Sequence, residues 1–532
     1  PQHGKTTLLE LMATWCFNDP TRCTVVLDPH GDMAERLIGL IPPERARSTI
    51  LIDAADLTRS VGLNLLDVQA GLSPDEISET FVNVGRSLWK EYWGPRMLIP
   101  LVNGLQALAE ANLRRAPERQ YTLLSLWPLL NCRSEARAEF LRREVPAETR
   151  PELHRYFLGA YDALSPSLRE TVISPVNSKM QAFERAAFMR RLVGQPRSTV
   201  HLAEAIRSRA IVIVNLNAAR LGNDLAGFLG SFILNVIRNV ILAQGQMARG
   251  ERVQVTAIAD EAQLFDGIDY ADYTATLLKF GGNLILGTQS LANLRRMAGS
   301  SESGRESVDG LLAGLTTLVA LQLNGDDAQY LVGREFDAEQ LRPESLTTLS
   351  AFMAYVRTVT DDNRVVPLYS VELERPLDPD PATAHLVRGA VSAYTTAVDE
   401  ADRLARASIQ RFEEAYELGD AQPEVATFGD EARAAMAQLA TRPADQAPAP
   451  LVVEAGRAPS WPSVRLPGMD VDDVEIQPQL ASVASRLKVR AAGGRAVGDS
   501  SDAKGSTNGS GSGDSGESDA HLSGGSRPRR PL

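Results

Sequence analysis

The chain has 532 residues, a formal net charge of −12 at pH 7, 44% hydrophobic residues and 23% charged residues. That length gives room for two or three domains with a sizeable core, and the composition is that of a globular protein. The negative net charge excludes a uniformly basic protein that coats nucleic acid, but it is compatible with a local basic channel.

The cysteine content and the hydropathy of the sequence indicate the cellular compartment of the protein. The three cysteines, Cys16, Cys23 and Cys132, are odd in number and lack metal-ligand or disulfide spacing, which suits a reducing cytosol. No signal peptide is visible. We interpret the longest apolar run, residues 228–243, as a buried core helix rather than a membrane span, because polar residues interrupt it. The sequence therefore predicts a cytoplasmic protein.

Residues 4–6, Gly-Lys-Thr, form the second half of a phosphate-binding loop, G-x-x-x-x-G-K-[ST]. The first glycine of that motif would lie two residues before Pro1, and the chain does not begin with Met. We therefore expect a fragment cut at its N-terminus. Half a motif also fits an ordinary helix start, so the assignment needs partners further along the chain.

Each residue of this loop has a predicted role in binding nucleotide. Gly4 lets backbone N–H groups curl around phosphates, because a Cβ would block the approach. Lys5 would reach the β- and γ-phosphates, and Thr6 would place its hydroxyl on Mg²⁺. Thr7 completes the predicted nucleotide-binding set. The apolar residues after it predict a helix whose N-terminal dipole favours the anion.

The segment after this helix predicts an α/β domain. Residues 24–28 and 49–53 are short apolar runs rich in β-formers, with a predicted helix over residues 33–40 between them. Alternation of helices and strands indicates a mostly parallel sheet. His30 lies alone in the turn after the first strand, and we assign it no chemistry.

From Ser73 the periodicity becomes helical. Ser73-Pro74-Asp75-Glu76 predicts a helix start, and helical spacing continues to about Met189. We expect an all-helical insertion whose last long helix begins at Ser174. The aromatic group in its first part is interpreted as core: Trp89, Tyr92 and Trp93.

Strand signals return at residues 210–216, and a long helix is predicted over residues 221–243. Further strands are expected at 252–261 and 283–289, and three more are expected to complete the sheet, at 317–323, 352–357 and 365–371. An amphipathic helical segment is predicted over 384–418, and the Gly-, Ser- and Asp-rich remainder predicts a disordered tail.

These patterns predict five parts. They are a first part of an α/β nucleotide-binding domain (1–72), the all-helical insertion (73–200), the second part of the nucleotide-binding domain (201–375), a helical extension (376–420) and a disordered tail (421–532).

Three polar residues at strand ends complete a candidate site. In open parallel sheets, ligands lie at the carboxyl ends of the strands. Asp260 and Glu261 close an apolar strand, as a Walker B strand requires, so Asp260 would hold Mg²⁺ and Glu261 would polarise the attacking water. Gln289, at the end of the next strand, is placed to sense the γ-phosphate. Each feature alone is common, but together with the loop they predict an ATPase.

The order of motifs resembles the coupling-protein ATPases of conjugative type IV secretion, which belong with the FtsK/HerA-type DNA translocases. The similarity covers roughly residues 1–372. It is carried by the motifs Gly4-Lys5-Thr6-Thr7, Leu27-Asp28-Pro29-His30-Gly31-Asp32, Trp93-Gly94-Pro95-Arg96, Ser174-Pro175-Val176-Asn177-Ser178-Lys179, Val214-Asn215-Leu216, Asp260-Glu261-Ala262-Gln263 and Thr288-Gln289-Ser290.

The resemblance implies a hexameric RecA-like motor that pumps DNA through a central pore with ATP and Mg²⁺. It implies relaxase and secretion-channel partners, and contact with the inner face of the cell membrane through a segment upstream of Pro1. One departure stands out. Many relatives have an arginine upstream of the sensor glutamine, where this chain has Lys279. We therefore expect either that Arg295, Arg296 or Arg305 supplies the arginine finger or that hydrolysis is slower.

Two alternatives stay open at this point. One is a chromosomal HerA-like helicase that works with a nuclease. The other is a nucleotide-gated docking platform that recruits secretion cargo without processive pumping. DNA-stimulated ATP turnover distinguishes a motor from a platform.

Overall fold

The computed structural model describes residues 4–68, 72–89, 94–265, 268, 270–297, 302–360, 364, 366–416 and 488–491. The predicted tail lies outside this part of the chain except for one strand, β11 (Lys488–Ala491), and Tyr92 and Trp93 also lie outside it.

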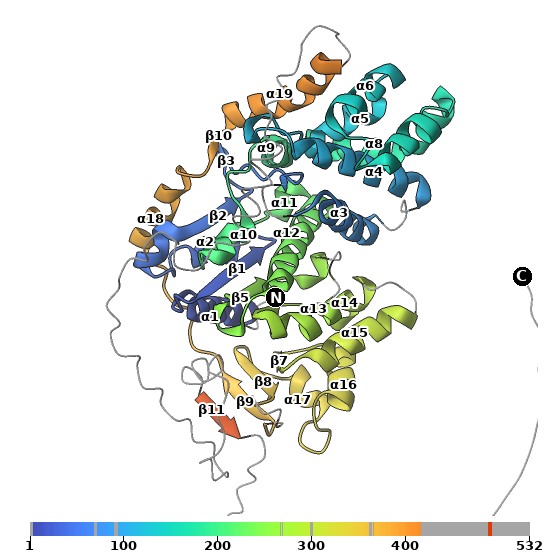
Figure 1. Ribbon diagram of the computed structural model, residues 1–532. Helices are drawn as coiled ribbons and strands as arrows, with labels where there is room; N and C mark the ends of the chain where they lie inside the picture. The colour runs from blue at the N-terminus through green and yellow to red at the C-terminus, as the bar shows by residue number, and fades with distance from the viewer. Residues whose placement is uncertain are drawn as a thin grey trace, which may run out of the picture. The chain divides into compact units, whose positions relative to one another are not determined.

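A five-stranded parallel sheet forms the centre of the fold and confirms the predicted α/β class (Figure 1). Its order is β2-β4-β1-β5-β6. β1 and β4 are buried along their whole length, as expected of parallel strands covered on both faces. The strands are β1 (Arg22–Asp28), β2 (Thr49–Asp53), β4 (Ile211–Asn215), β5 (Gln254–Ala259) and β6 (Gly282–Leu286).

Side chains that alternate along β1 belong to two apolar cores, one on each face of the sheet. Val26 packs with residues of α1 (Lys5–Phe17) and α2 (Asp32–Leu37). Val25 and Leu27 pack on the opposite side with residues of α12, the long helix that follows β4. This alternation is the period of two that a strand imposes on its side chains.

Helix α12 (Asn223–Ala243) is the buried core helix predicted from the long apolar run. Its most apolar stretch of 18 residues has a mean hydropathy of 1.7, and in the described part of the chain this helix alone is long and apolar enough to cross a membrane. Two thirds of its most apolar stretch (67%) is buried inside the fold. Phe228 stacks on Trp89 and packs edge-on against Phe183, so Trp89, the described member of the predicted aromatic group, forms core as expected.

Helices occupy the described residues between 72 and 200. They are α3 (Pro74–Leu88), α4 (Pro95–Asn112), α5 (Leu126–Asn131), α6 (Ser134–Glu144), α7 (Pro151–His154), the π-helical turn η6 (Arg155–Tyr161), α8 (Pro166–Arg185) and α9 (Ala187–Gly194). Ser73 caps α3 as predicted, because its hydroxyl accepts from the Glu76 N–H while the Glu76 carboxylate accepts from the Ser73 N–H.

The predicted start of the last long helix at Ser174 is wrong. Helix α8 begins eight residues earlier, because Ser165 caps it and Pro166 occupies its first position. Pro175 then lies inside the helix, where it removes one backbone hydrogen bond without ending the helix. The division into domains stays a prediction.

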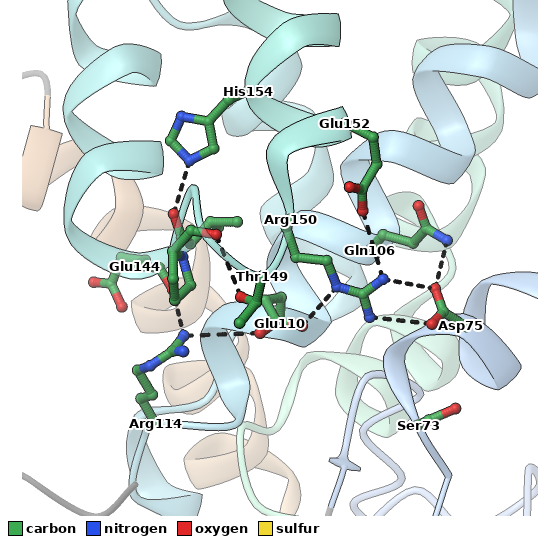
Figure 2. Close-up of polar contacts among 12 residues, drawn as sticks. Ser73, Asp75, Gln106, Glu110, Arg114, Glu144, Thr149, Arg150, Glu152 and His154 are labelled. Atoms are coloured by element: carbon green, nitrogen blue, oxygen red, sulfur yellow. Dashed lines mark hydrogen bonds and ion pairs between the residues drawn. The ribbon is translucent and has the colours of Figure 1, made fainter.

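An ion network joins the helices of this region (Figure 2). Arg150, just before α7, donates to Glu110 of α4 at 2.9 Å and to Asp75 of α3 at 3.0 Å. Gln106 of α4 donates to the same Asp75 carboxylate at 3.0 Å. One guanidinium therefore holds three helices in register.

The prediction that three late strands complete the parallel sheet is wrong. β7 (Thr317–Ala320), β8 (Met353–Thr358) and β9 (Tyr369–Glu372) form a separate antiparallel sheet with β11, in the order β11-β9-β8-β7. The described residues between β8 and β9 contain no helix, whereas a parallel neighbour needs a crossover, usually through a helix. Helices α16 (Gly325–Arg334) and α17 (Pro343–Thr347) lie beside this sheet (Figure 1).

The predicted single helical segment over 384–418 is two helices, α18 (Pro381–Val391) and α19 (Val398–Tyr416). Strand β10 (Thr396–Ala397) separates them and pairs with β3 (Arg59–Ser60). The break has a tertiary cause, because the hydroxyl of Tyr394 accepts a hydrogen bond from the Leu51 N–H of β2 at 2.7 Å. Local periodicity does not reveal that contact.

Candidate nucleotide-binding site

Helix α1 begins directly after Gly4, the end of the predicted phosphate-binding loop. Gly4 has φ +103°, a left-handed conformation that favours glycine, and a Cβ there would lie 2.9 Å from Leu373 and 3.1 Å from Phe352. Lys5 and Thr6 lie in the first turn of the helix, and no residue of that turn is acidic. The helix start is therefore suited to an anion.

Asp260 and Glu261 follow β5 at the carboxyl edge of the sheet. The Asp260 N–H still donates to the Leu27 carbonyl of β1 at 3.1 Å, whereas Glu261 turns sharply away with φ +46°. Left-handed backbone is uncommon for glutamate, and such strain gathers at functional turns. Both side chains are about 95% buried.

Lys5, Asp260 and Glu261 meet although 255 residues separate them. The Lys5 ammonium donates to both carboxylates. Gln289, just beyond β6, donates to Glu261 Oε1 at 2.7 Å. The structure thus brings together the three predicted catalytic residues, Lys5, Glu261 and Gln289, with the predicted metal ligand Asp260.

These side chains border a cavity of about 700 Å³ that Thr6 also lines. That volume is typical of small-molecule sites. Thr7, predicted to bind nucleotide, is half-buried and does not line the cavity within the described residues. Gly4 contributes through its backbone conformation at the start of α1 rather than through the cavity wall.

The two carboxyl groups differ in their electrostatics. Burial raises the pKa of Asp260 above its ordinary value, and the charge of Lys5 only partly offsets this. Burial also acts on Glu261, but hydrogen bonds and charge from Lys5, with further hydrogen bonds from Gln263 and Gln289, hold the pKa of Glu261 below its ordinary value. Glu261 is therefore ionised at neutral pH and able to accept a proton.

Replacing Lys5 with Met should reverse the contribution of Glu261 to the pH dependence of stability and strengthen that of Asp260. Without the ammonium, burial and mutual repulsion dominate, so both carboxyl pKa values rise above those of the unfolded chain. The folded state then binds more protons than the unfolded state, and the free energy of unfolding increases as pH falls toward 5. Urea unfolding between pH 5 and 8 measures this free energy. A variant whose stability does not increase on acidification contradicts the pairing of Lys5 with the two carboxylates.

The donor set fits Mg²⁺ bound with a triphosphate. In the described residues no cluster of three or more His, Cys, Asp or Glu could hold a metal ion alone. Mg²⁺ commonly takes one or two carboxylates and completes its shell with phosphate oxygens and water. Asp260 and the Thr6 hydroxyl supply such a partial set on the cavity wall.

Sequence reasoning missed several site residues. Gln263 donates to Glu261 Oε2 and accepts from the Thr288 hydroxyl at 3.0 Å, so it fixes the carboxylate. His30, to which no chemistry was assigned, lines the cavity on a turn that Asp28 organises by accepting from the His30 N–H at 2.9 Å. The Asp-Pro-His-Gly run predicts the turn but not the position of this turn beside the phosphate-binding loop.

The basic residues of the chain differ in how far the structure describes their side chains. Lys279 is exposed on a turn after α13 (Tyr270–Leu277). The side chains of Arg295, Arg296 and Arg305 lie outside the described part of the chain, so the predicted arginine finger stays a prediction. Arg190 and Arg191 both pair with Asp402 of α19, at 3.0 and 2.8 Å.

No family model and no curated protein matches the sequence. Among solved structures, the chain is similar to the plasmid coupling protein TrwB in complex with a non-hydrolysable ATP analogue, with 15% identity and a TM-score of 0.49 over 71% of this chain and 84% of that one. TrwB in complex with ADP and Mg²⁺ matches with 15% identity and a TM-score of 0.47, over 72% and 85% of the two chains. VirB4 of Thermoanaerobacter pseudethanolicus matches with 13% identity and a TM-score of 0.37, over 69% and 91%.

Proposed function

We propose that this chain is an ATP-hydrolysing motor that moves DNA, of the coupling-protein kind that its sequence motifs resemble. The observation that carries the proposal is the meeting of Lys5, at the start of α1, with the Asp260–Glu261 pair at the end of β5. Gln289 completes the set from the neighbouring strand. A cation, two carboxylates and an amide around one cavity are the groups that phosphoryl transfer to water requires.

Lys5 acts as the exchangeable cation of the site. Its ammonium now neutralises Asp260 and Glu261, and it would turn to the phosphates when nucleotide enters. Asp260 and Thr6 would hold Mg²⁺, which neutralises charge on the transferred phosphate when bound. Glu261, released from Lys5 but still held by Gln289, would accept the proton of the attacking water.

Gln289 links this chemistry to a basic segment. Helix α14 (Leu291–Met297) begins two residues after Gln289 and contains Arg295 and Arg296. The Leu291 N–H donates to the buried carboxylate of Asp327 at 3.1 Å, which anchors the start of this helix. A change in the hydrogen bond between Gln289 and Glu261 would therefore move the base of a helix that carries two arginines.

Further features of the proposal come from the resemblance. They are a homo-hexamer, DNA as the translocated polymer, relaxase and secretion-channel proteins as partners, and attachment at the inner face of the membrane through a segment upstream of Pro1. Because the protein has a net charge of −12, it must hold DNA with a local basic surface rather than with the whole molecule.

Replacing Lys5 with Ala should weaken ATP affinity. The variant loses a charge-assisted hydrogen bond to the phosphates, worth ~1.5–3 kcal/mol, or roughly 10- to 150-fold in Kd. Calorimetric titration of a protein that includes the residues upstream of Pro1 measures this. Lys279→Ala is the matched control, because that lysine is exposed and does not line the cavity. Equal affinity of both variants and the wild type contradicts the loop assignment.

Replacing Arg295 and Arg296 with Ala should weaken DNA binding and flatten its dependence on salt. Each phosphate contact adds about 0.9 to the slope of log affinity against log salt concentration, so the double variant should lose about 2. Fluorescence anisotropy with labelled duplexes and an ATP analogue provides the measurement. Arg142→Ala/Arg143→Ala is the control, since that pair lies on α6 with Glu139. An unchanged slope excludes α14 from the DNA surface.

A further inference from the structure

Phe352 combines a strained backbone with an exposed aromatic ring. It lies between α17 and β8 and has φ +64°, a left-handed conformation that makes a bulky residue an outlier. The residue is also 38% exposed, so packing in a core does not account for its position. Backbone strain of this kind gathers at active sites and at clamps that hold ligands, which makes Phe352 a candidate ligand contact.

Two backbone hydrogen bonds hold Phe352 in this conformation. The Leu373 N–H donates to the Phe352 carbonyl at 2.7 Å and extends the pairing of β8 with β9 by one residue pair. The Met353 N–H donates to the Ser350 carbonyl at 3.1 Å and closes a four-residue turn. Phe352 is the third residue of that turn, where a positive φ favours glycine or asparagine. The sheet and the turn therefore fix the backbone at a position that either of these smaller residues can also occupy.

The ring of Phe352 lies against the phosphate-binding loop. A Cβ built on Gly4 would lie 3.1 Å from Cδ1 of Phe352 and 3.4 Å from its Cα. Lys5 and Thr6 follow Gly4 and border the cavity that Asp260 also lines, whereas Phe352 does not line that cavity. A molecule whose phosphates reach Lys5 would therefore find an exposed aromatic ring beside the loop and outside the cavity.

We propose that Phe352 is the platform on which the nucleobase of bound ATP stacks. The inference rests on the proposed function, because it takes the phosphates to lie at Gly4, Lys5 and Thr6. Every nucleobase has a flat π-face, and an aromatic side chain stacks on any of them. The platform adds affinity for the nucleoside end of the ligand, while the groups around the cavity act on its phosphates.

The attachment of the base to the phosphates favours this occupant of the ring over others. A base joined through its ribose to phosphates at Lys5 is confined to the neighbourhood of Phe352, so that stacking is effectively intramolecular. Trp127, the other exposed aromatic residue in the described part of the chain, lies on α5 in the helical region. Phe352 is thus the exposed ring that the loop itself selects, and Trp127 provides a control.

Calorimetric titration of the full-length protein with ATP and with inorganic tripolyphosphate, both in the presence of Mg²⁺, tests the proposal. Phe352→Gly should bind ATP roughly 5- to 150-fold more weakly, as when an aromatic partner of a base is removed. It should bind tripolyphosphate, which has no base, as tightly as the wild type. Phe352→Trp keeps a stacking surface and should retain the ATP affinity of the wild type, as should the control Trp127→Ala.

The outcomes separate this inference from the proposed function. Wild-type ATP affinity in Phe352→Gly overturns the platform and leaves the proposed function intact. An equal loss of affinity for ATP and tripolyphosphate also overturns it, because the ring then only supports Gly4. If the wild type binds neither ligand, the proposed function fails first and the platform with it. Phe352→Asn, which also tolerates positive φ, repeats the test without the aromatic ring, and circular dichroism checks that both variants fold.

Discussion

Replacing Glu261 with Gln is expected to lower ATP turnover by roughly 10²-fold or more while nucleotide stays bound. Gln keeps the size of the side chain but cannot take a proton from water. The carboxylate now accepts hydrogen bonds from Lys5, Gln263 and Gln289, all of which favour its ionised form. The wild-type side chain is therefore ionised and can accept a proton once Lys5 turns to the phosphates, whereas the amide cannot.

Single-turnover and steady-state assays measure hydrolysis, and calorimetry measures nucleotide binding. Together they separate the effect of Glu261→Gln on turnover from its effect on affinity. Glu204→Gln, on the exposed face of α10 (Leu202–Arg207), is the matched control with the same chemical change. Asp260→Asn should instead raise the Mg²⁺ concentration needed for activity. If Glu261→Gln turns over like the wild type, the base is another residue.

Replacing Arg137 with Met is expected to destabilise the helical region by about 3–5 kcal/mol. Arg137 of α6 is fully buried, and its guanidinium pairs with Asp162 and lies 4.7 Å over the Tyr161 ring. It also donates to three backbone carbonyls between 2.9 and 3.0 Å, those of Leu129, Leu130 and Cys132. Met fills part of the space but leaves these carbonyls without the guanidinium and Asp162 with only the longer ion pair to Arg169, at 3.8 Å.

Thermal and urea denaturation of the variant give the measurement. Arg142→Ala is the matched control on the same helix, because Arg142 is 67% exposed and pairs with Glu139 at the surface. Surface pairs of this kind contribute little to stability because solvent screens them. Equal stability of the two variants would show that the buried guanidinium is not needed to hold α5, α6 and η6 together.

Much of the central sheet could be predicted from the sequence. The apolar runs that became β1, β4 and β5 are continuous, as in buried parallel strands, and the carboxylates at the end of β5 mark the ligand edge. Lys5, Glu261 and Gln289 could be grouped because their roles are known from the chemistry of nucleotide hydrolysis.

Other features depend on contacts that a sequence does not show. The late strands have the same β-rich composition as the early ones, so nothing local indicates that β7, β8 and β9 form a second sheet. The interruption between α18 and α19 depends on Tyr394 reaching β2. Likewise, Gln263 has no recognisable signal, because its role exists only when Thr288 and Glu261 lie on either side of it.

The most direct test of the motor proposal is ATP turnover with and without DNA at low salt, in the protein that includes its upstream residues. The account predicts measurable turnover that DNA increases several-fold, with the increase lost as salt rises, because phosphates are contacted rather than bases. Absence of turnover, or turnover that DNA leaves unchanged at low salt, would contradict a DNA-translocating ATPase.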